Sequence, residues 1–305
     1  MAKDILVGTP GIATAYRARE RGRLGAMARQ SGVLIRRNPL GFIGLIIIVA
    51  FLVIAILAPA LAPFSPTDIR AGLPNESMSA NHWFGTDRSG NDIMSRDIYG
   101  ARISLEVAFL SVIGGSIIGT VVGIISGYSS GIIDSMIQRG VDTAIAFPGL
   151  LLLLIIVQAL GPSMWTVIFA IIIGIIPGVT RVVRGAALSE KNNQYVEAAR
   201  SIGASTPRIL FRHILPNVMA LAIVIMTTLL GAAILAEASL SFLGLGIPNA
   251  ASWGRDVSVA RDTRPFNVPA ALFPGAAIAL TVLGFNLLGD AIRDIADPRL
   301  RGSQS

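Results

Sequence analysis

Long apolar runs dominate the pattern of hydrophobic and polar positions along this chain. A helix needs roughly 20 mostly apolar residues to cross the hydrocarbon core of a membrane. Six runs have about that length, at 40–62, 103–127, 143–161, 164–180, 217–245 and 268–289. Lipid-exposed backbone must satisfy its own hydrogen bonds, which a helix does. The pattern therefore predicts an all-α, polytopic membrane protein with six transmembrane helices.

The polar segments between these runs predict the orientation of the helices. Lys and Arg are enriched in the cytoplasmic segments of membrane proteins. With a cytoplasmic N-terminus, the inside segments hold eighteen Lys and Arg residues and the outside segments hold six. We therefore expect both termini in the cytoplasm. Residues 17–37 alternate Arg with apolar side chains, as in a helix on the inner leaflet or a solvated basic tail.

This topology divides the chain into four parts. Residues 1–39 form a basic cytoplasmic segment, and 40–101 hold the first membrane helix and an external loop. Residues 102–290 form a core of five membrane helices with a cytoplasmic loop at 189–216, and 291–305 form a cytoplasmic tail.

Glycine and proline modify this picture at particular points. Gly115, Gly119, Gly123 and Gly127 recur every four residues on one face of the second run, which predicts close helix packing. Pro148 and Pro177 are expected to bend or end the third and fourth helices.

Composition excludes several classes of function. The chain is 53% hydrophobic and only 14% charged, with a mean hydropathy of +0.68, which does not suit a water-facing surface. Its net charge of +7 lies in separate segments between apolar runs, so no continuous patch for nucleic acid forms. The absence of Cys removes disulfides, thiolate metal sites and Cys nucleophiles.

The sequence also lacks the motifs of a nucleotide or metal enzyme. A phosphate-binding P-loop needs Gly-Lys-Ser/Thr, yet the only lysines, Lys3 and Lys191, follow Ala2 and Glu190. The only histidines, His82 and His213, lie on opposite sides of the membrane in this topology. We therefore expect no catalytic residue, no metal ligand and no ATP hydrolysis by this chain.

The loop between the fourth and fifth runs has a recognisable local structure. Gly203 suits the left-handed position that ends a helix, and Thr206 can cap a second helix with Pro207 in its first turn. Pro216 is expected to close that second helix just before the membrane. Two short helices joined by a sharp bend would then lie on the cytoplasmic face.

The residues of this loop resemble a known motif. Glu197-Ala198-Ala199, then Gly203, then Ile214-Leu215-Pro216 is similar to the EAA loop of ABC importer permeases, which couples the permease to its ATP-hydrolysing subunit. The resemblance implies a set of ATPase-coupling residues: Glu197, Ala198, Ala199, Gly203, Leu215 and Pro216.

Further segments narrow the resemblance to the second permease of dipeptide and oligopeptide importers. They are HWFGTDRSGNDIMSRDIYGARISL at 82–105, EASLSFLGLGIP at 237–248, SWG at 252–254 and GDAIRDIADPRLR at 289–301. Asn91 stands where that group commonly has Arg. The resemblance extends from about residue 35 onward and implies the type I ABC importer permease fold.

The same resemblance implies the partners and location of the chain. The partners are a second homologous permease, one or two ATP-binding subunits, an external solute-binding protein and the lipid of the bacterial inner membrane, with no nucleic acid. ATP and Mg²⁺ would be used by the ATP-binding subunits, and this chain would bind no cofactor. Di- or oligopeptides are the expected cargo, and glutathione, nickel chelates and related solutes stay open as alternatives.

Two carboxylates lie inside the apolar runs. Glu106 is four residues from Arg102, which predicts an ion pair along one helix near the outer interface. Glu237 has no partner nearby in sequence. It either lines the translocation path, where it would contact a peptide's amino terminus, or bonds to a neighbouring helix.

Two other functions fit the sequence less well. A secondary transporter driven by an ion gradient would need charged relays within the spans and inverted repeats. A membrane-embedded hydrolase would need a nucleophile and a base, and neither HExxH nor GxSxG occurs.

Overall fold

A computed structural model describes residues 38–66, 71–129, 131–263 and 266–296. The alternatives for residues 17–37 and most of the expected tail therefore lie outside the described residues. Within these ranges the chain is helical, with a single isolated β-bridge between Thr86 and Asp92. Five of the described helices are long and apolar enough to cross a membrane, and a bent pair of helices makes a sixth span.

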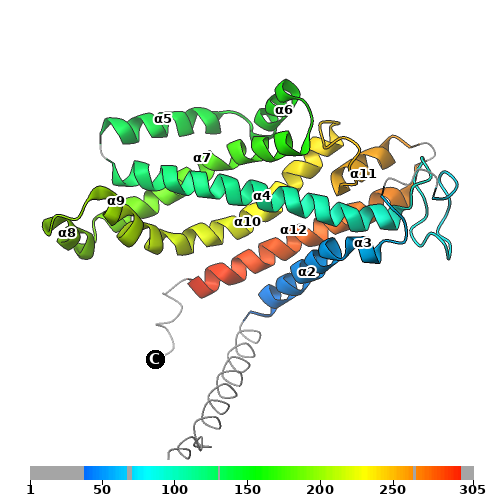
Figure 1. Ribbon diagram of the computed structural model, residues 1–305, viewed down its shortest axis with the longest axis horizontal. Helices are drawn as coiled ribbons and strands as arrows, with labels where there is room; N and C mark the ends of the chain where they lie inside the picture. Colours follow the sequence, from blue (N-terminus) through cyan, green and yellow to red (C-terminus); the bar gives the residue numbers. More distant parts are fainter. Residues whose placement is uncertain (1–37, 67–70, 130, 264–265, 297–305) are drawn as a thin grey trace, which may run out of the picture.

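The elements follow one another as a bundle of long helices with short ones at its two ends (Figure 1). In chain order they are α2 (Pro39–Ile56), α3 (Ala58–Leu61), α4 (Ile93–Tyr128), α5 (Ile132–Ala146), α6 (Gly149–Leu160), α7 (Met164–Lys191), α8 (Gln194–Ser201), α9 (Thr206–Ile209), a π-helical turn (Leu210–Ile214), α10 (Leu215–Phe242), α11 (Trp253–Arg261) and α12 (Val268–Ala296).

The glycine stripe of α4 packs closely against α7, as the sequence predicts. A Cβ on Gly115 would lie 2.9 Å from the Ile175 side chain, and one on Gly127 would lie 2.7 Å from the Arg184 carbonyl oxygen. Residue numbers rise together along both helices, so α4 and α7 run parallel. The chain between them must therefore return along the bundle from the end of α4 to the start of α7.

The pair α5 and α6 makes this return crossing. The two helices are bent by 90° at Phe147 and Pro148, because proline cannot continue a helix without losing a hydrogen bond. This bend confirms the prediction for Pro148, but the expected bounds of the third span, 143–161, are wrong. Its crossing begins eleven residues earlier, at Ile132, in a stretch whose charges resemble those of a loop.

Other helix boundaries also differ from the apolar runs. Helix α4 begins at Ile93, so the division expected at residue 102 falls inside a helix. Asp92 caps this helix by accepting a 2.7 Å hydrogen bond from the Ser95 backbone N–H. Helix α7 continues through Pro177 to Lys191, so this proline does not end it. Apolar length marks the membrane core of a helix, whereas caps set its ends.

Helices α2, α10 and α12 complete the bundle. Gly44 of α2 packs on Leu287 and Leu288 of α12, and Gly41 lies against Ala291, so these two helices run antiparallel. Gly289 in turn contacts Thr228 of α10. The start of α2 and the end of α12 therefore lie toward the same end of the bundle as α8 and α9 (Figure 1).

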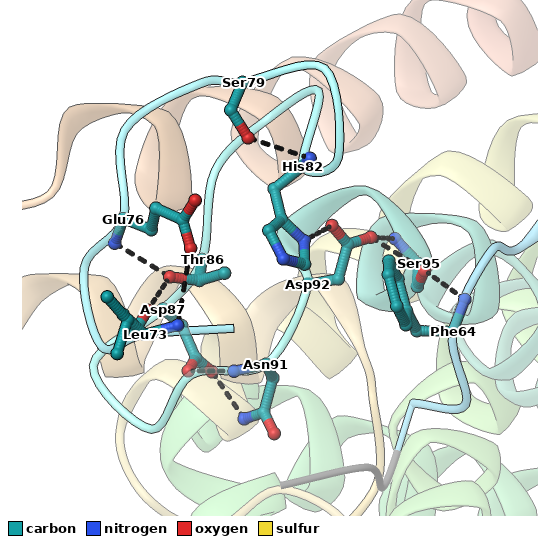
Figure 2. A network of polar contacts seen from close by, with 10 residues as sticks. All are labelled: Phe64, Leu73, Glu76, Ser79, His82, Thr86, Asp87, Asn91, Asp92 and Ser95. Carbon is teal, nitrogen blue, oxygen red and sulfur yellow. Dashed lines mark hydrogen bonds and ion pairs between the residues drawn. The ribbon is translucent and has the colours of Figure 1, made fainter. Parts of the chain in front are cut away.

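At the opposite end of the bundle, residues 71–92 form a compact segment held by polar contacts (Figure 2). The His82 ring nitrogen Nδ1 lies 2.9 Å from Asp92 Oδ1, and both side chains are buried. Asp87 accepts hydrogen bonds from the Asn91 backbone and side chain at 2.9 and 2.7 Å. These hydrogen bonds pair polar groups in a segment that has no regular secondary structure.

Helix α11 is anchored on the first turns of α4. Trp253 is fully buried, and its Nε1 donates a 3.0 Å hydrogen bond to the Asp97 carbonyl oxygen. Arg96 Nε donates to Asp256 Oδ1 at 2.9 Å. Burial raises the pKa of the Asp256 carboxyl, and the charge and hydrogen bond of Arg96 oppose that shift. Contacts between residues 160 positions apart in sequence therefore hold this end of the bundle together.

Candidate functional site

The predicted cytoplasmic loop forms a projecting segment between α7 and α10, here called the coupling segment (residues 192–214). Helix α8 ends where Gly203 takes a left-handed φ of +81°. The Gly203 N–H donates to the Arg200 carbonyl at 3.0 Å, and the Ala204 N–H donates to the Ala199 carbonyl at 3.0 Å. This pair of bonds is a Schellman motif, which confirms Gly203 as the helix stop.

The second half of the coupling segment differs from its prediction in two ways. Ser205, not Thr206, occupies the N-cap of α9, without a side-chain capping bond. Pro216 does not close the helix, because α9, the π-helical turn and α10 follow one another without a break. The Leu215 N–H bonds to the Leu210 carbonyl, five residues back. This wider turn gives room for a proline, whose ring crowds the preceding turn of a regular α-helix.

Two buried faces hold the coupling segment against the bundle. Val196 on the inner face of α8 is fully buried. Ile209 and Ile214 in the second half of the segment are buried as well. Lys191 Nζ donates a 2.7 Å hydrogen bond to the Tyr128 carbonyl oxygen at the end of α4. The segment is therefore a supported projection and not a free loop.

Polar contacts join the start of the segment to the helices on either side of it. The Tyr195 hydroxyl donates to Glu190 and accepts a 3.1 Å hydrogen bond from Asn217 Nδ2. Partial burial and the bond to Glu190 raise the pKa of Tyr195, so the phenol stays protonated as a donor at neutral pH. The start of α8 is thereby linked to the start of α10.

The outer surface of the segment is an open groove of about 510 Å³. Its lining includes the expected residues Ala198, Ala199 and Gly203. The other expected residues do not line it: Glu197 is exposed beside it, and Leu215 and Pro216 begin α10. Ala198, Ala199 and Gly203 add only small side chains to the wall of this groove.

The structure adds residues that the sequence interpretation missed. Ile202 is 86% exposed at the tip, and Phe211 is 69% exposed. Arg208 and Arg212 contribute positive charge to the groove. The local sequence carries no signal for the exposure of Ile202, because an apolar C-cap residue can equally pack against its own helix.

Glu237 lies far from this segment and is fully buried between helices. Its carboxylate accepts hydrogen bonds from Ser104 of α4 at 3.1 Å and from Ser241 of α10 at 2.7 Å. Of the two roles left open by the sequence, the structure therefore shows the bond to a neighbouring helix. The carboxylate has no exposed surface from which to contact cargo in this conformation.

The expected pair of Arg102 and Glu106 does not form. Both side chains are exposed on α4, and none of the ion pairs between described residues joins them. A spacing of four residues permits such an ion pair, but the pair contributes little stabilising free energy at an exposed position.

Sequence comparison places this arrangement among known proteins. The family described as binding-protein-dependent transport system inner membrane component matches residues 119–302, which include the coupling segment. The N-terminal transmembrane domain of oligopeptide transport permease C matches residues 34–77.

The chain belongs to the binding-protein-dependent transport permeases.

Curated relatives of this permease are similar over most of their length. The dipeptide transport system permease protein DppC of Alkalihalophilus pseudofirmus is 43% identical over 277 residues, or 90% of each chain. The glutathione transport system permease protein GsiD of Escherichia coli is 42% identical over 88% of this chain and 89% of its own. A putative peptide transport system permease of Brucella suis is 42% identical over 85% of this chain and 88% of its own.

A solved structure supports the fold of the permease. The MetNI methionine ABC transporter, in inward-facing conformations, matches with a TM-score of 0.50 and 19% identity, over 65% of this chain and 97% of that one. The permease is accordingly a multi-pass protein of the bacterial inner membrane with the ABC importer permease fold. Among the described residues, no group of three or more His, Asp or Glu side chains could hold a metal ion.

Proposed function

We propose that this permease forms half of the translocation path of an importer for di- or oligopeptides and couples it to a separate ATPase. The observation that carries the proposal is the coupling segment, a supported projection with an open groove and an exposed apolar tip. Exposed Ile202 and Phe211 suit burial in a partner protein, since apolar surface removed from water contributes about 25 cal/mol per Å².

The continuity of α9, the π-helical turn and α10 gives the coupling segment a mechanical role. Residues 206–242 are helical without a break, a length of about 55 Å at 1.5 Å per residue. A displacement of α9 would be transmitted along this helix to Glu237, which accepts a hydrogen bond from Ser104 of α4. ATP binding would close the ATPase pair, move the coupling segment and rock the bundle between inward and outward openings.

The partners of the proposal follow from this role. They are a second homologous permease, one or two ATP-binding subunits and an external solute-binding protein that delivers the peptide. This chain binds no ATP, and Mg²⁺ and ATP belong to the ATP-binding subunits. Peptide cargo is supported by relatives whose names specify dipeptide, peptide and glutathione transport.

Two measurements test the proposed function. The purified chain is expected to hydrolyse no ATP above a protein-free baseline, and labelled dialanine and tetra-alanine should accumulate only in cells that have this subunit. Hydrolysis by a preparation free of partner subunits would contradict the division of labour. Unchanged accumulation of both peptides after deletion of the subunit would contradict the cargo.

The orientation is a second prediction, with both termini and the coupling segment in the cytoplasm. Ser79 and Ser205 are exposed at opposite ends of the bundle, and the chain contains no Cys. In intact cells an impermeant thiol reagent should label Ser79→Cys and not Ser205→Cys, and permeabilised cells should show both. Labelling of Ser205→Cys in intact cells would reverse the topology and remove the coupling segment from the ATPase side.

A further inference from the structure

Three charged side chains lie on the outside of this chain, two on the return crossing and one on the neighbouring helix α7. Arg139 and Asp142 are exposed on α5, and Arg181 is exposed on α7. Asp142 and Arg181 form an ion pair, with 63% and 50% of their side chains exposed. Helix α5 lies at the edge of the bundle, beside α7 (Figure 1).

Contacts at the start of α5 show how deep these charges lie. Asp134 accepts hydrogen bonds from Ser126 at 2.5 Å and from Arg184 at 2.6 and 2.7 Å. The start of α5 is therefore level with the last turn of α4. Asp142 follows eight residues later, about 12 Å further along the crossing. In a hydrocarbon core of about 30 Å, that position is inside the crossing but nearer its coupling-segment end, because Arg181 directly follows the apolar run 164–180.

The exposed surface of α5 has a polar side and an apolar side. Ser135, Arg139 and Asp142 recur at intervals of four and three residues, which places them on one stripe. Ile133, Met136 and Gly140 form a second exposed stripe, which carries no charged side chain and continues to Thr143. Position 140 lies about 160° around the helix from position 142, at nearly the same depth.

The polar stripe is unsuited to lipid. Charged residues within a membrane span are costly to expose to lipid, so they almost always face a bundle interior or a water-filled cavity. These residues face away from the interior of this chain. A dry interface with another subunit is also unfavourable, because desolvating an ion pair often costs more than the pair regains. The charges avoid both lipid and a dry interface if water contacts the polar stripe while lipid or protein covers the apolar stripe.

We propose that Arg139, Asp142 and Arg181 line the translocation path and that their mixed charges contact a solute carrying both signs of charge, such as a peptide with free termini. This inference rests on the proposed function, because it requires an assembled transport path. It moves the cargo-facing role from Glu237, which is buried, to the polar stripe of α5 and the facing residue of α7.

Thiol chemistry in the assembled transporter tests this assignment. The subunit with Asp142→Cys, or with Arg139→Cys, is assembled with its partners in lipid nanodiscs, which expose both membrane faces. A charged, water-soluble thiol reagent is added without nucleotide and with ATP. The thiolate is the reactive form, and apolar surroundings suppress it. Both variants are expected to react at least tenfold faster than the matched control Gly140→Cys, whose added side chain meets nothing within 4 Å.

Three results would overturn the inference. The polar stripe is no more exposed to water than the apolar stripe if Gly140→Cys reacts as fast as Asp142→Cys. No path reaches it if Asp142→Cys and Arg139→Cys stay unreactive in both nucleotide states. It is a subunit interface if both react in the isolated chain but are fully protected in the complex. Co-purification of the ATPase and peptide uptake, measured beside these rates, separate failure of this inference from failure of the proposed function.

Discussion

Gly123→Val is expected to prevent accumulation of a folded permease. A Cβ at this position would lie 2.8 Å from the Thr180 carbonyl oxygen and 2.8 Å from the Val183 Cβ. Backbone atoms of α7 cannot rotate away, so the parallel helices α4 and α7 must separate. Overpacking of this kind costs about 1–3 kcal/mol per site and more where backbone is displaced. That is a large share of the stability of most proteins.

The measurement is the amount of monodisperse protein in detergent and its thermal unfolding temperature, for this chain without partners. Gly185→Val is the matched control, because it lies on α7 of the same pair and its Cβ meets nothing within 4 Å. Gly123→Ala should fall between the two. Equal yield and unfolding temperature for Gly123→Val and the unmodified chain would show that the close approach is not needed for folding.

Ile202→Asp is expected to weaken association with the ATPase by tenfold to a hundredfold while leaving the permease folded. Ile202 is 86% exposed, so the bundle does not depend on it. Burying such a side chain in a partner contributes about 1.5–3 kcal/mol, and each 1.4 kcal/mol changes an affinity tenfold. Association is measured by titrating the purified ATPase onto the permease in nanodiscs, with transport per inserted molecule measured beside it.

Two further variants decide how the tip acts. Gln194→Glu adds the same charge at the exposed start of α8 and should leave association near its original value. Gly203→Val keeps Ile202 but strains the left-handed bend by about 1–2 kcal/mol, and should reduce association and transport without blocking insertion. Normal association and transport by Ile202→Asp would remove the apolar tip from the docking surface.

The candidate site was predictable in part from local sequence. Gly203 was identified because a left-handed helix stop depends on one residue and its immediate neighbours. Its neighbours Ala198 and Ala199 were identified with it, and both line the groove. The exposure of Ile202 was not predictable, because it depends on how the bundle supports both halves of the segment.

The sequence by itself determined the features that depend on local chemistry. Apolar length predicts the membrane helices, four glycines at fixed spacing predict the close face of α4, and Pro148 marks the break in the third crossing. Each of these signals lies within a few turns of one helix, so neighbouring residues suffice to specify it.

Only the tertiary structure decided which polar residues are inside the bundle and which face outward. Glu237 accepts a hydrogen bond from Ser104, 133 residues away in sequence. Arg139 and Asp142, in contrast, lie on α5, whose charge content is typical of a loop. The burial of a charged group depends on partners brought together by packing, and these partners are distant in sequence. Periodicity describes the faces of a helix, but contacts between helices decide what each face meets.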